Sequence, residues 1–239
     1  MSTAVPDTRI YQAGESLPEE FHDLLLRMLT HHLENTTSPD YAELLGMLWH
    51  KCMTLAPTEH HKIALARLMA QEVHHGVITA EILATLGVDH VEHTKRQYLF
   101  DLPIETWCDL CMFHCLGDRV GMYVGENWGN VPYEPLRSVA PQLHRDEIGH
   151  ATLGYHNLKE LCQTKEGLAE ANDKIKKWWP AALDMFGRSN SSSSELYVKW
   201  QIQSASNEEL RKQYIRDVRP MLEALGIQVP DDKANRRYL

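Results

Sequence analysis

Apolar residues recur at intervals of three and four positions along most of the chain, which is the spacing of a helix face that packs against a core. Runs of alternating β-branched residues, which would predict strands, are nearly absent, and glycine and proline are sparse. The expected helices cover residues 17–34, 38–51, 58–87, a stretch that starts near 101–107 and passes 118, a stretch from before 147 to about 162, 167–179, 192–200 and 207–226. The pattern therefore predicts an all-α protein.

Residues with special backbone preferences sharpen some of these boundaries. Ser38 and Pro39 suit the N-cap and the first helical position of the second helix. Residues 189–194 should form a loop that ends in an N-cap, and the polar tail after Pro230 should be extended. Pro141 should either kink its helix or mark where the regular part of that helix begins.

Composition and charge narrow the class of protein. The chain has 239 residues, of which 43% are hydrophobic and 24% charged, as is usual for a globular protein. A net charge of −9 offers no basic face for nucleic acid, and the apolar runs fall far short of the roughly 20 residues that cross a bilayer. The N-terminus does not resemble a signal peptide, and five cysteines do not form a disulfide pattern. We therefore expect a cytoplasmic protein that binds neither nucleic acid nor a membrane.

Two copies of a Glu-x-x-His motif lie 75 residues apart, at Glu72–His75 and Glu147–His150. An acidic residue precedes each copy by 29 residues, Glu43 before the first and Asp118 before the second. The offset of 75 also aligns ELLGMLW with DRVGMYV, glycine on glycine and methionine on methionine. One such motif is weak evidence, but several positions that agree at one offset are not expected by chance. We infer two copies of one helix pair, each carrying an acid and then Glu-x-x-His.

Other groups of similar residues carry less weight. A third match, Glu19–His22, has no acid upstream and no copy 75 residues later, so we interpret it as the polar side of an amphipathic helix. The three cysteines of WCDLCMFHC lack the further ligands of a zinc or iron–sulfur site and are expected in the core. His50 and His114 could support metal ligands, but a core or surface position is favoured. The basic run 174–177 is interpreted as solvated.

The chemistry of the repeat favours a metal centre. Residues three apart on a helix share a face, so the Glu and the His of each motif point the same way. Asp118 lies three residues after Cys115, and steps of three and four place it on the same face of an apolar helix as Cys108, Cys111 and Cys115. A carboxylate on such a face needs a cationic partner such as Arg or a metal ion, and the repeat favours the metal ion. Four acids and two His are the ligand set of a dinuclear centre in a ferritin-like four-helix bundle. They would balance two divalent ions and suit iron or manganese better than structural zinc.

This interpretation also predicts the organisation of the chain. We expect one ferritin-like domain over residues 1–239, a four-helix bundle with additional N- and C-terminal helices. Residues 1–37 would form an N-terminal helical segment, residues 38–165 the metal-binding bundle, and residues 166–239 the C-terminal helices and tail.

Several stretches resemble the family of the catalytic, di-iron component of phenylacetyl-CoA 1,2-epoxidase. The resemblance rests on AELLGML, on the APT turn and EVHHG at matching spacing, and on KKWWPAALDMFG and NEELRKQYIRDVRPMLEALGIQVPD, and it runs from about Tyr41 to Asp231. It implies two iron ions and an O₂-dependent epoxidation of an aromatic ring carried as a CoA thioester. The residues that it implies as iron ligands and catalytic residues are Glu43, Glu72, His75, Asp118, Glu147 and His150.

Partners and alternatives follow from the same resemblance. It implies a non-catalytic sister subunit, and family members continue beyond VPDD with an extension that contributes to that assembly. The sequence has no flavin, iron–sulfur or nicotinamide motif, so a separate reductase is expected. The segment between Ala84 and Trp107 matches poorly, which leaves the substrate open. The alternatives are an oxygenase of another small molecule or biosynthetic intermediate, a ferroxidase-like protein, and a non-catalytic subunit or homo-oligomer of the same fold.

Overall fold

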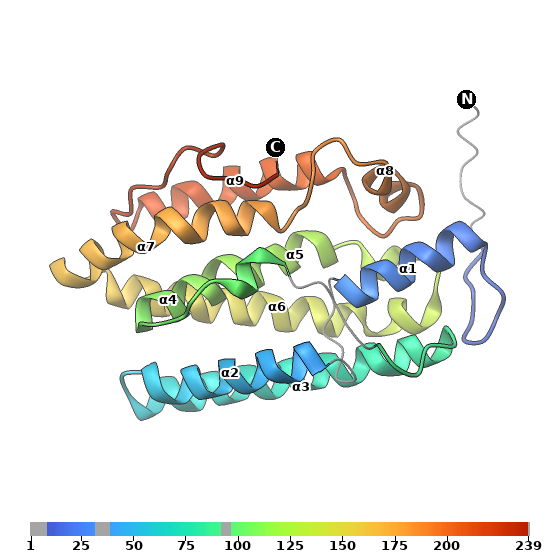
Figure 1. Ribbon diagram of the computed structural model, residues 1–239, viewed down its shortest axis with the longest axis horizontal. Coiled ribbons are helices and arrows are strands. Elements are labelled where there is room, and N and C mark those ends of the chain that lie inside the picture. The colour runs from blue at the N-terminus through green and yellow to red at the C-terminus, as the bar shows by residue number, and fades with distance from the viewer. Residues whose placement is uncertain (1–8, 32–38, 92–96, 239) are drawn as a thin grey trace.

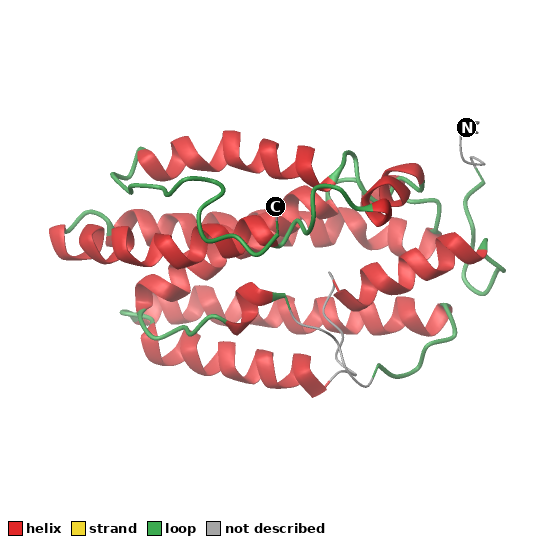
Figure 2. Ribbon diagram, turned by 45° about the horizontal axis from the view of Figure 1, so that its top comes forward, coloured by secondary structure: helices red, strands yellow, loops and turns green. Residues whose placement is uncertain are grey.

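The computed structural model describes residues 9–31, 39–91 and 97–238, and in this part of the chain all regular structure is helical (Figure 1, Figure 2). The elements are α1 (Glu19–His31), α2 (Pro39–Leu55), α3 (Glu59–Thr85), the 3₁₀ turn η1 (Tyr98–Asp101), α4 (Trp107–Met112), the π-helix η2 (Phe113–Asp118), α5 (Arg119–Gly125), the 3₁₀ turn η3 (Trp128–Asn130), α6 (Glu134–Leu161), α7 (Lys165–Asp184), α8 (Ser192–Lys199) and α9 (Asn207–Glu223). The prediction of an all-α protein is confirmed.

Four helical rods form a ferritin-like bundle. α2 packs on α3, α3 on α6, and α6 on the continuous rod α4–η2–α5, which contacts α2 in turn through α4. Figure 1 shows α2 and α3 along one edge of the molecule, α4 to α6 in the middle, and α7 with α9 along the opposite edge. α1 and α8 contact each other at one end of this stack. The two Glu-x-x-His motifs therefore lie on neighbouring rods, α3 and α6.

Capping residues mark several of the predicted boundaries. α2 begins at Pro39 as predicted, while Ser38 lies outside the described residues. The Thr58 side chain caps α3 by accepting a hydrogen bond from the backbone N–H of His61. Gly87 follows this helix with a φ of +79°, a left-handed conformation that a residue with a Cβ rarely adopts.

The fourth predicted helix begins at the last residue of the stretch 101–107 in which its start was expected. Residues 98–101 form the separate turn η1, and α4 begins only at Trp107. A capping box fixes this start, because Thr106 and Asp109 each accept a hydrogen bond from the other's backbone N–H. α4 then continues into η2, whose wider π-helical turns the apolar spacing did not predict. Short π segments inside helices are frequently found at functional sites.

The alternative in which Pro141 marks the start of its helix is wrong. α6 begins at Glu134 and runs unbroken through Pro141 to Leu161. Another proline, Pro135, lies in the first turn, where a backbone N–H has no partner within the helix, so the lack of this group in proline costs no hydrogen bond. Pro141 itself is exposed, so its ring is directed away from the bundle core.

Two groups of buried hydrophobic residues hold the helices together. The larger group fills the bundle and the space below α7 and α9, and it includes the fully buried Trp178 and Trp179. It also contains the three cysteines of α4 and η2, whose pKa values are raised by burial, so these thiols are uncharged core residues as predicted. The smaller group joins α1 and α8 to α3 and α6, where Phe21 stacks on Trp200.

A buried ion cluster ties α7 to the bundle. Asp109 on α4 is 0% exposed and accepts a hydrogen bond from Trp178 Nε1 at 2.9 Å. Its carboxylate oxygens also lie 3.0 Å from Lys174 Nζ and 2.8 Å from Lys177 Nζ. Burial alone would raise the pKa of Asp109, but the hydrogen bonds from Lys177, Trp178 and Lys174 lower it to about 2. The expectation that residues 174–177 are solvated is therefore wrong for these two lysines.

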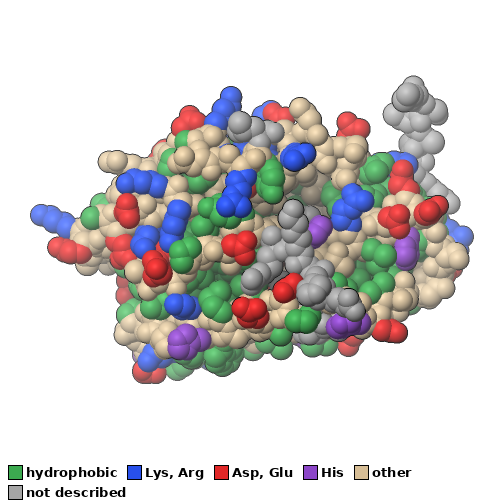
Figure 3. Space-filling model, viewed as in Figure 1, with side chains coloured by type: hydrophobic (Ala, Val, Ile, Leu, Met, Phe, Trp, Pro, Cys, Tyr) green, Lys and Arg blue, Asp and Glu red, His purple; other side chains and the backbone are tan. Residues whose placement is uncertain are grey.

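The surface is mixed in character. On the face shown in Figure 3, basic and acidic side chains are interspersed, and hydrophobic side chains lie between them. The larger exposed hydrophobic residues include Trp49 and Ile63, on α2 and α3. Over the described ranges, none of the helices combines the length and the apolar character that crossing a membrane requires.

Candidate metal centre

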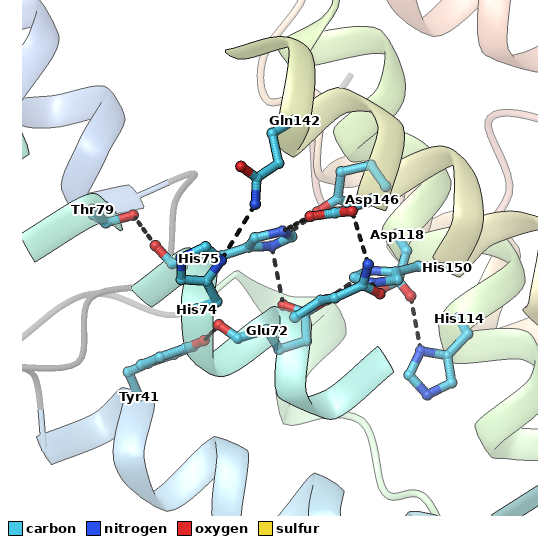
Figure 4. A network of polar contacts seen from close by, with 12 residues as sticks. Tyr41, Glu72, His74, His75, Thr79, His114, Asp118, Gln142, Asp146 and His150 are labelled. Carbon is cyan, nitrogen blue, oxygen red and sulfur yellow. Dashed lines mark hydrogen bonds and ion pairs between the residues drawn. The ribbon is translucent and has the colours of Figure 1, made fainter. Parts of the chain in front are cut away.

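The two Glu-x-x-His motifs meet where α3 packs on α6 (Figure 4). His75 and His150 are 1% and 2% exposed, and their ring centroids are 5.7 Å apart. Glu72 Oε1 lies 2.8 Å from His150 Nδ1, so the acid of one motif meets the histidine of the other. His75 Nδ1 lies 3.8 Å from Glu72 Oε2 and 3.8 Å from Glu147 Oε1. The repeat in the sequence becomes a single four-residue cluster in the structure.

The Nε2 atom of each imidazole contacts the residue that precedes the glutamate of the other motif. His75 Nε2 lies 3.2 Å from Asp146 Oδ2, and His150 Nε2 lies 3.0 Å from Gln71 Oε1. Gln71 Nε2 donates to Asp146 Oδ1 at 2.8 Å, which joins the two contacts into one chain. Because a carboxylate and an amide oxygen can only accept, Nε2 of each histidine carries the hydrogen. In the neutral imidazole Nδ1 then carries the lone pair, and it faces the glutamates as a metal ligand would.

The inward-facing atoms suit a metal ion. Ligand atoms from Glu72, Glu147 and His150 all lie within 4.8 Å of one another. The buried His150 Nδ1 makes no hydrogen bond of good geometry, although Glu72 Oε1 is only 2.8 Å away. A histidine whose other nitrogen donates to a carboxylate or carbonyl oxygen is the common form of a metal-binding histidine. The residues and their geometry fit a metal centre.

The close approach of acids and imidazoles shifts pKa values within the cluster. Burial would raise the pKa of Glu72, but a protonated His150, whose Nδ1 lies 2.8 Å from Glu72 Oε1, outweighs burial, so the pKa is lowered. Burial would lower the pKa of His150, but Glu72 outweighs it in the same way, so that pKa is raised. The buried carboxylate is therefore stabilised by positive charge, which is also what a metal ion would provide.

Asp118 borders the same site from η2. It lines one cavity together with Glu72 and Glu147. Its Oδ2 lies 2.8 Å from Nδ1 of the buried His114, four residues earlier in the π-helix. Burial disfavours a charge on His114, but the Asp118 carboxylate raises the pKa of this histidine to about 10. His114, for which the sequence favoured no role, thus orients a predicted ligand.

The sixth predicted ligand, Glu43, is not brought to the cluster. Tyr41, Leu44 and Leu48 face the core from α2, and the helical register places Glu43 on the exposed side. The Tyr41 hydroxyl closes this side of the site by donating to the backbone oxygen of Glu72 at 2.8 Å. Glu43 would have to turn inward to bind a metal, so its role stays a prediction.

Gly121 allows α5 to approach the cluster closely. A Cβ at this position would lie 2.7 Å from Oε2 and 3.0 Å from Cδ of Glu147, which is inside contact distance. The corresponding glycine of the first half of the repeat, Gly46 on α2, has no heavy atom within 4 Å of such a Cβ. The aligned glycines therefore differ, and only Gly121 makes room for a predicted ligand.

A cavity of about 70 Å³, which we call the inner cavity, lies against the cluster. Its polar lining comes from Glu72, His114, Asp118 and Glu147. Its hydrophobic lining comes from Tyr41, Leu44, Leu45, Leu48, Met69, Phe100, Phe113 and Met185. Polar groups thus lie on the side of the predicted ligands, and the rest of the lining is suited to an apolar or aromatic group.

Sequence reasoning missed Gln71 and Asp146. Each directly precedes a motif glutamate, so the two residues share the 75-residue offset of the repeat. Comparing the two halves at one more position would have found them. The unrelated match Glu19–His22 lies at the start of α1, where His22 Nε2 contacts the backbone oxygen of Leu86 at 3.4 Å, and it takes no part in the site.

Known proteins with similar sequences agree with this site. A family model described as Phenylacetic acid catabolic protein matches residues 36–238. The A subunit of 1,2-phenylacetyl-CoA epoxidase from Escherichia coli (strain K12) is 26% identical over 230 residues, which cover 90% of this chain and 71% of that protein. The family match spans every helix that carries a predicted ligand, and it confirms the resemblance noted in the sequence. The chain belongs to the phenylacetic acid catabolic protein family.

Proposed function

We propose that this chain is the iron-bearing subunit of a di-iron oxygenase, which adds one oxygen atom from O₂ to an aromatic acyl-CoA or a related substrate. One observation carries the proposal: two Glu-x-x-His motifs from neighbouring helices form a buried cluster in which both Nδ1 atoms face carboxylates. Membership of the family and the likeness to the E. coli epoxidase chain support the same activity.

The residues of the cluster would hold two iron ions. The motifs Glu72–His75 and Glu147–His150 supply four ligands, Asp118 supplies a fifth from η2, and Glu43 a sixth if α2 turns it inward. When bound, the iron pair supplies the activation of O₂ and the transfer of one oxygen atom. Asp146 and Gln71 orient the two imidazoles through their Nε2 atoms, and His114 orients Asp118. The apolar lining of the inner cavity excludes water from the site.

The cavity and the family support an aromatic substrate and protein partners for this chain. Phe100 and Phe113 line the inner cavity and would pack against an aromatic ring. Electrons would come from a separate reductase. The E. coli relative is named as one subunit of its enzyme, which supports a partner subunit for this chain as well.

Metal loading tests the ligand assignment. The purified chain is incubated anaerobically with Fe(II), and we expect about two irons per chain from the ligand count. Glu72→Ala should lose most of this iron while keeping its helicity by circular dichroism, and Glu81→Ala, an exposed glutamate on the same helix, should load normally. A Glu72→Ala chain that still holds two irons would show that the assignment is wrong. Well under one iron per wild-type chain would favour a non-catalytic subunit.

Turnover tests the reaction. The loaded chain is mixed with phenylacetyl-CoA, O₂ and a reductase, and mass spectrometry should detect a product heavier by one oxygen atom. Rapid iron oxidation that needs no organic substrate and yields no such product would favour a ferroxidase. Oxygen uptake with another acyl compound alone would change the substrate and keep the chemistry.

A further inference from the structure

Asp118 uses its two carboxylate oxygens unequally. Its Oδ2 lies 2.8 Å from Nδ1 of His114, a residue of the same π-helix η2. An ionised carboxylate only accepts hydrogen bonds, so Nδ1 carries a hydrogen whether the imidazole is neutral or charged. Oδ2 is therefore occupied by this contact, and Oδ1 is the oxygen that is left for a metal ion.

Glu72 presents its carboxylate differently. Its Oε1 lies 2.8 Å from His150 Nδ1, and its Oε2 lies 3.8 Å from His75 Nδ1. Glu72 thus turns one oxygen towards each motif histidine, whereas Asp118 has one oxygen engaged by His114. A hydrogen bond to an ionised acceptor is roughly twice as strong as a neutral one, so the contact with His114 is well able to keep Oδ2 in place.

The imidazole of His114 is fixed by aromatic packing. His114 is 2% exposed, and its ring meets that of Phe113 edge to face, with centroids 5.2 Å apart and an interplanar angle of 85°. Phe113 in turn meets Trp178 of α7 edge to face, with centroids 6.1 Å apart and an angle of 82°. Aromatic pairs favour such T-shaped contacts at these distances. The plane of the imidazole is therefore set from α7.

Trp178 is itself fastened to the bundle. Its side chain is fully buried, and its Nε1 donates to Asp109 Oδ1 at 2.9 Å. A continuous line of contacts therefore leads from the buried ion cluster to a predicted metal ligand. In order, its members are Asp109, Trp178, Phe113, His114 and Asp118.

The other polar groups near His114 and Asp118 do not replace this contact. Arg119, the next residue along the chain, donates to the backbone oxygens of Cys115 and Ala151, both at 3.1 Å. The second ring nitrogen of His114, Nε2, is buried and makes no hydrogen bond of good geometry within the described ranges, since the nearby thiol of Cys52 is a weak partner. The strong polar contact of this buried ring is the one with Asp118.

We propose that His114 is a positioning residue of the metal centre: it engages Oδ2 of Asp118, so that Asp118 binds metal through Oδ1 alone. Phe113 and Trp178 hold the imidazole in the plane that this contact needs. A carboxylate that binds through both oxygens takes up two coordination positions, so His114 keeps one position beside Asp118 open, as catalytic metal sites require. This inference rests on the proposed function and adds to it a residue that controls how one ligand binds.

Cobalt spectroscopy tests the role of His114. The full-length chain is loaded anaerobically with Co(II), whose visible absorption weakens as its coordination number rises. His114→Leu removes the donor, so Asp118 should bind through both oxygens, and the absorption per bound cobalt should fall. His114→Asn keeps an N–H close to the position of Nδ1 and should restore the wild-type spectrum. Circular dichroism shows that each variant keeps its helices.

Two neighbouring tryptophans provide a matched pair for the aromatic packing. Trp178 and Trp179 are both fully buried, and each donates its indole N–H to a carboxylate. Trp178 packs on Phe113, whereas Trp179 packs on Tyr214. Trp178→Phe should therefore change the cobalt spectrum in the same direction as His114→Leu. Trp179→Phe should lose similar stability and keep the wild-type spectrum.

Nitrogen-15 NMR of the histidine-labelled, metal-free chain gives a second readout. The buried Nδ1–H of His114 should exchange slowly with water and give a signal that disappears in His114→Asn. The same signal should move in Asp118→Asn, which replaces its acceptor. It should also move in Trp178→Phe but not in Trp179→Phe.

The outcomes separate this inference from the proposed function. A wild-type cobalt spectrum in a folded His114→Leu chain, or identical spectra of the two tryptophan variants, would overturn the inference and leave the proposed function intact. The lack of a slowly exchanging Nδ1–H from His114 would overturn it too. If His114→Leu does not fold, the tryptophan pair and the NMR signal decide. A wild-type chain that takes up no cobalt would contradict the proposed function and this inference with it.

Discussion

At the scale of single residues, His75 and His150 use their two ring nitrogens for different tasks. Nε2 donates to a fixed acceptor, and this contact selects both the tautomer and the direction of Nδ1. The two acceptors differ, since Asp146 is a carboxylate and Gln71 an amide. A carboxylate makes the imidazole that it contacts more basic, so the two halves of the repeat should not bind metal equally well.

Removing the carboxylate behind His75 should weaken metal binding. Asp146→Ala is expected to lower metal affinity by about 10–100-fold, the usual effect of losing such a contact. Asp146→Asn should recover part of the loss, because its amide oxygen can still accept the Nε2 hydrogen. A Co(II) titration followed by absorption measures both variants. Gln142→Ala is the control, since Gln142 contacts the exposed His74 instead of a predicted ligand; equal affinities in all variants would contradict the role of Asp146.

The close approach of Gly121 to the Glu147 carboxylate allows a second test, of whether Glu147 must keep its position to bind metal. In Gly121→Ala the new Cβ would meet Glu147 Oε2 at 2.7 Å, so the carboxylate must move while the fold is kept. We expect a normal melting temperature and weaker metal binding. Gly46→Ala, the aligned position with nothing within 4 Å, should bind metal like wild type. Indistinguishable metal affinities of the two variants would show that Glu147 need not keep this position.

At the scale of elements, the site depends on how closely α6 approaches the π-helix η2. A Cβ on Gly154 of α6 would lie 2.3 Å from the backbone nitrogen of Cys115 and 2.6 Å from the backbone carbon of His114. Backbone therefore meets backbone at this crossing, and neither side can yield as a flexible side chain would. The same contact keeps Asp118, at the end of η2, beside the glutamates of α3 and α6.

Gly154→Ala should therefore destabilise the bundle. Overpacking of this kind costs about 1–3 kcal/mol or more, which lowers the melting temperature of a chain of this size by several degrees. Gly149→Ala on the same helix has open space around its Cβ and should instead stabilise α6 by up to about 1 kcal/mol through helix propensity. Thermal unfolding followed by circular dichroism measures both, and equal melting temperatures would contradict the tight crossing.

The elements also show what the sequence could predict. Apolar spacing predicted the helices, and the repeat predicted that the motifs of α3 and α6 would meet, because both signals are local or periodic. The π-helical turns of η2 and the register of α2, which turns Glu43 outward, depend on packing against other helices and leave no mark in the spacing. The partners of Asp109 were missed for the same reason, since Lys174 and Lys177 lie on a helix distant in sequence.

At the scale of the whole molecule, Asp109 fastens the outer layer of helices to the bundle. Its carboxylate on α4 holds Lys174, Lys177 and the indole of Trp178 from α7, without any exposure to solvent. α7 leads directly to Met185, which lines the inner cavity, and so positions this part of the cavity wall. The stability of this layer should therefore depend on the charge of one buried carboxylate.

The pH dependence of unfolding tests this link. The pKa of Asp109 is about 2 in the folded chain, against 3.8 as its ordinary value, so ionisation of this group stabilises the fold by about 2 kcal/mol. Because the folded pKa is the lower one, this stability is present above pH 4 and is lost as the pH falls towards 2. Asp109→Asn should be less stable than wild type in urea at pH 7, with a difference that shrinks over that interval. A difference independent of pH would contradict the link.

The contact between Asp184 and residues 236–238 has a consequence for proteolysis. Asp184 accepts hydrogen bonds from Arg236 Nε and from the backbone N–H groups of residues 237 and 238, and so fastens this segment to the end of α7. Asp184→Ala should release the segment, and limited trypsin digestion should then cleave after Arg236 and Arg237 faster than in wild type.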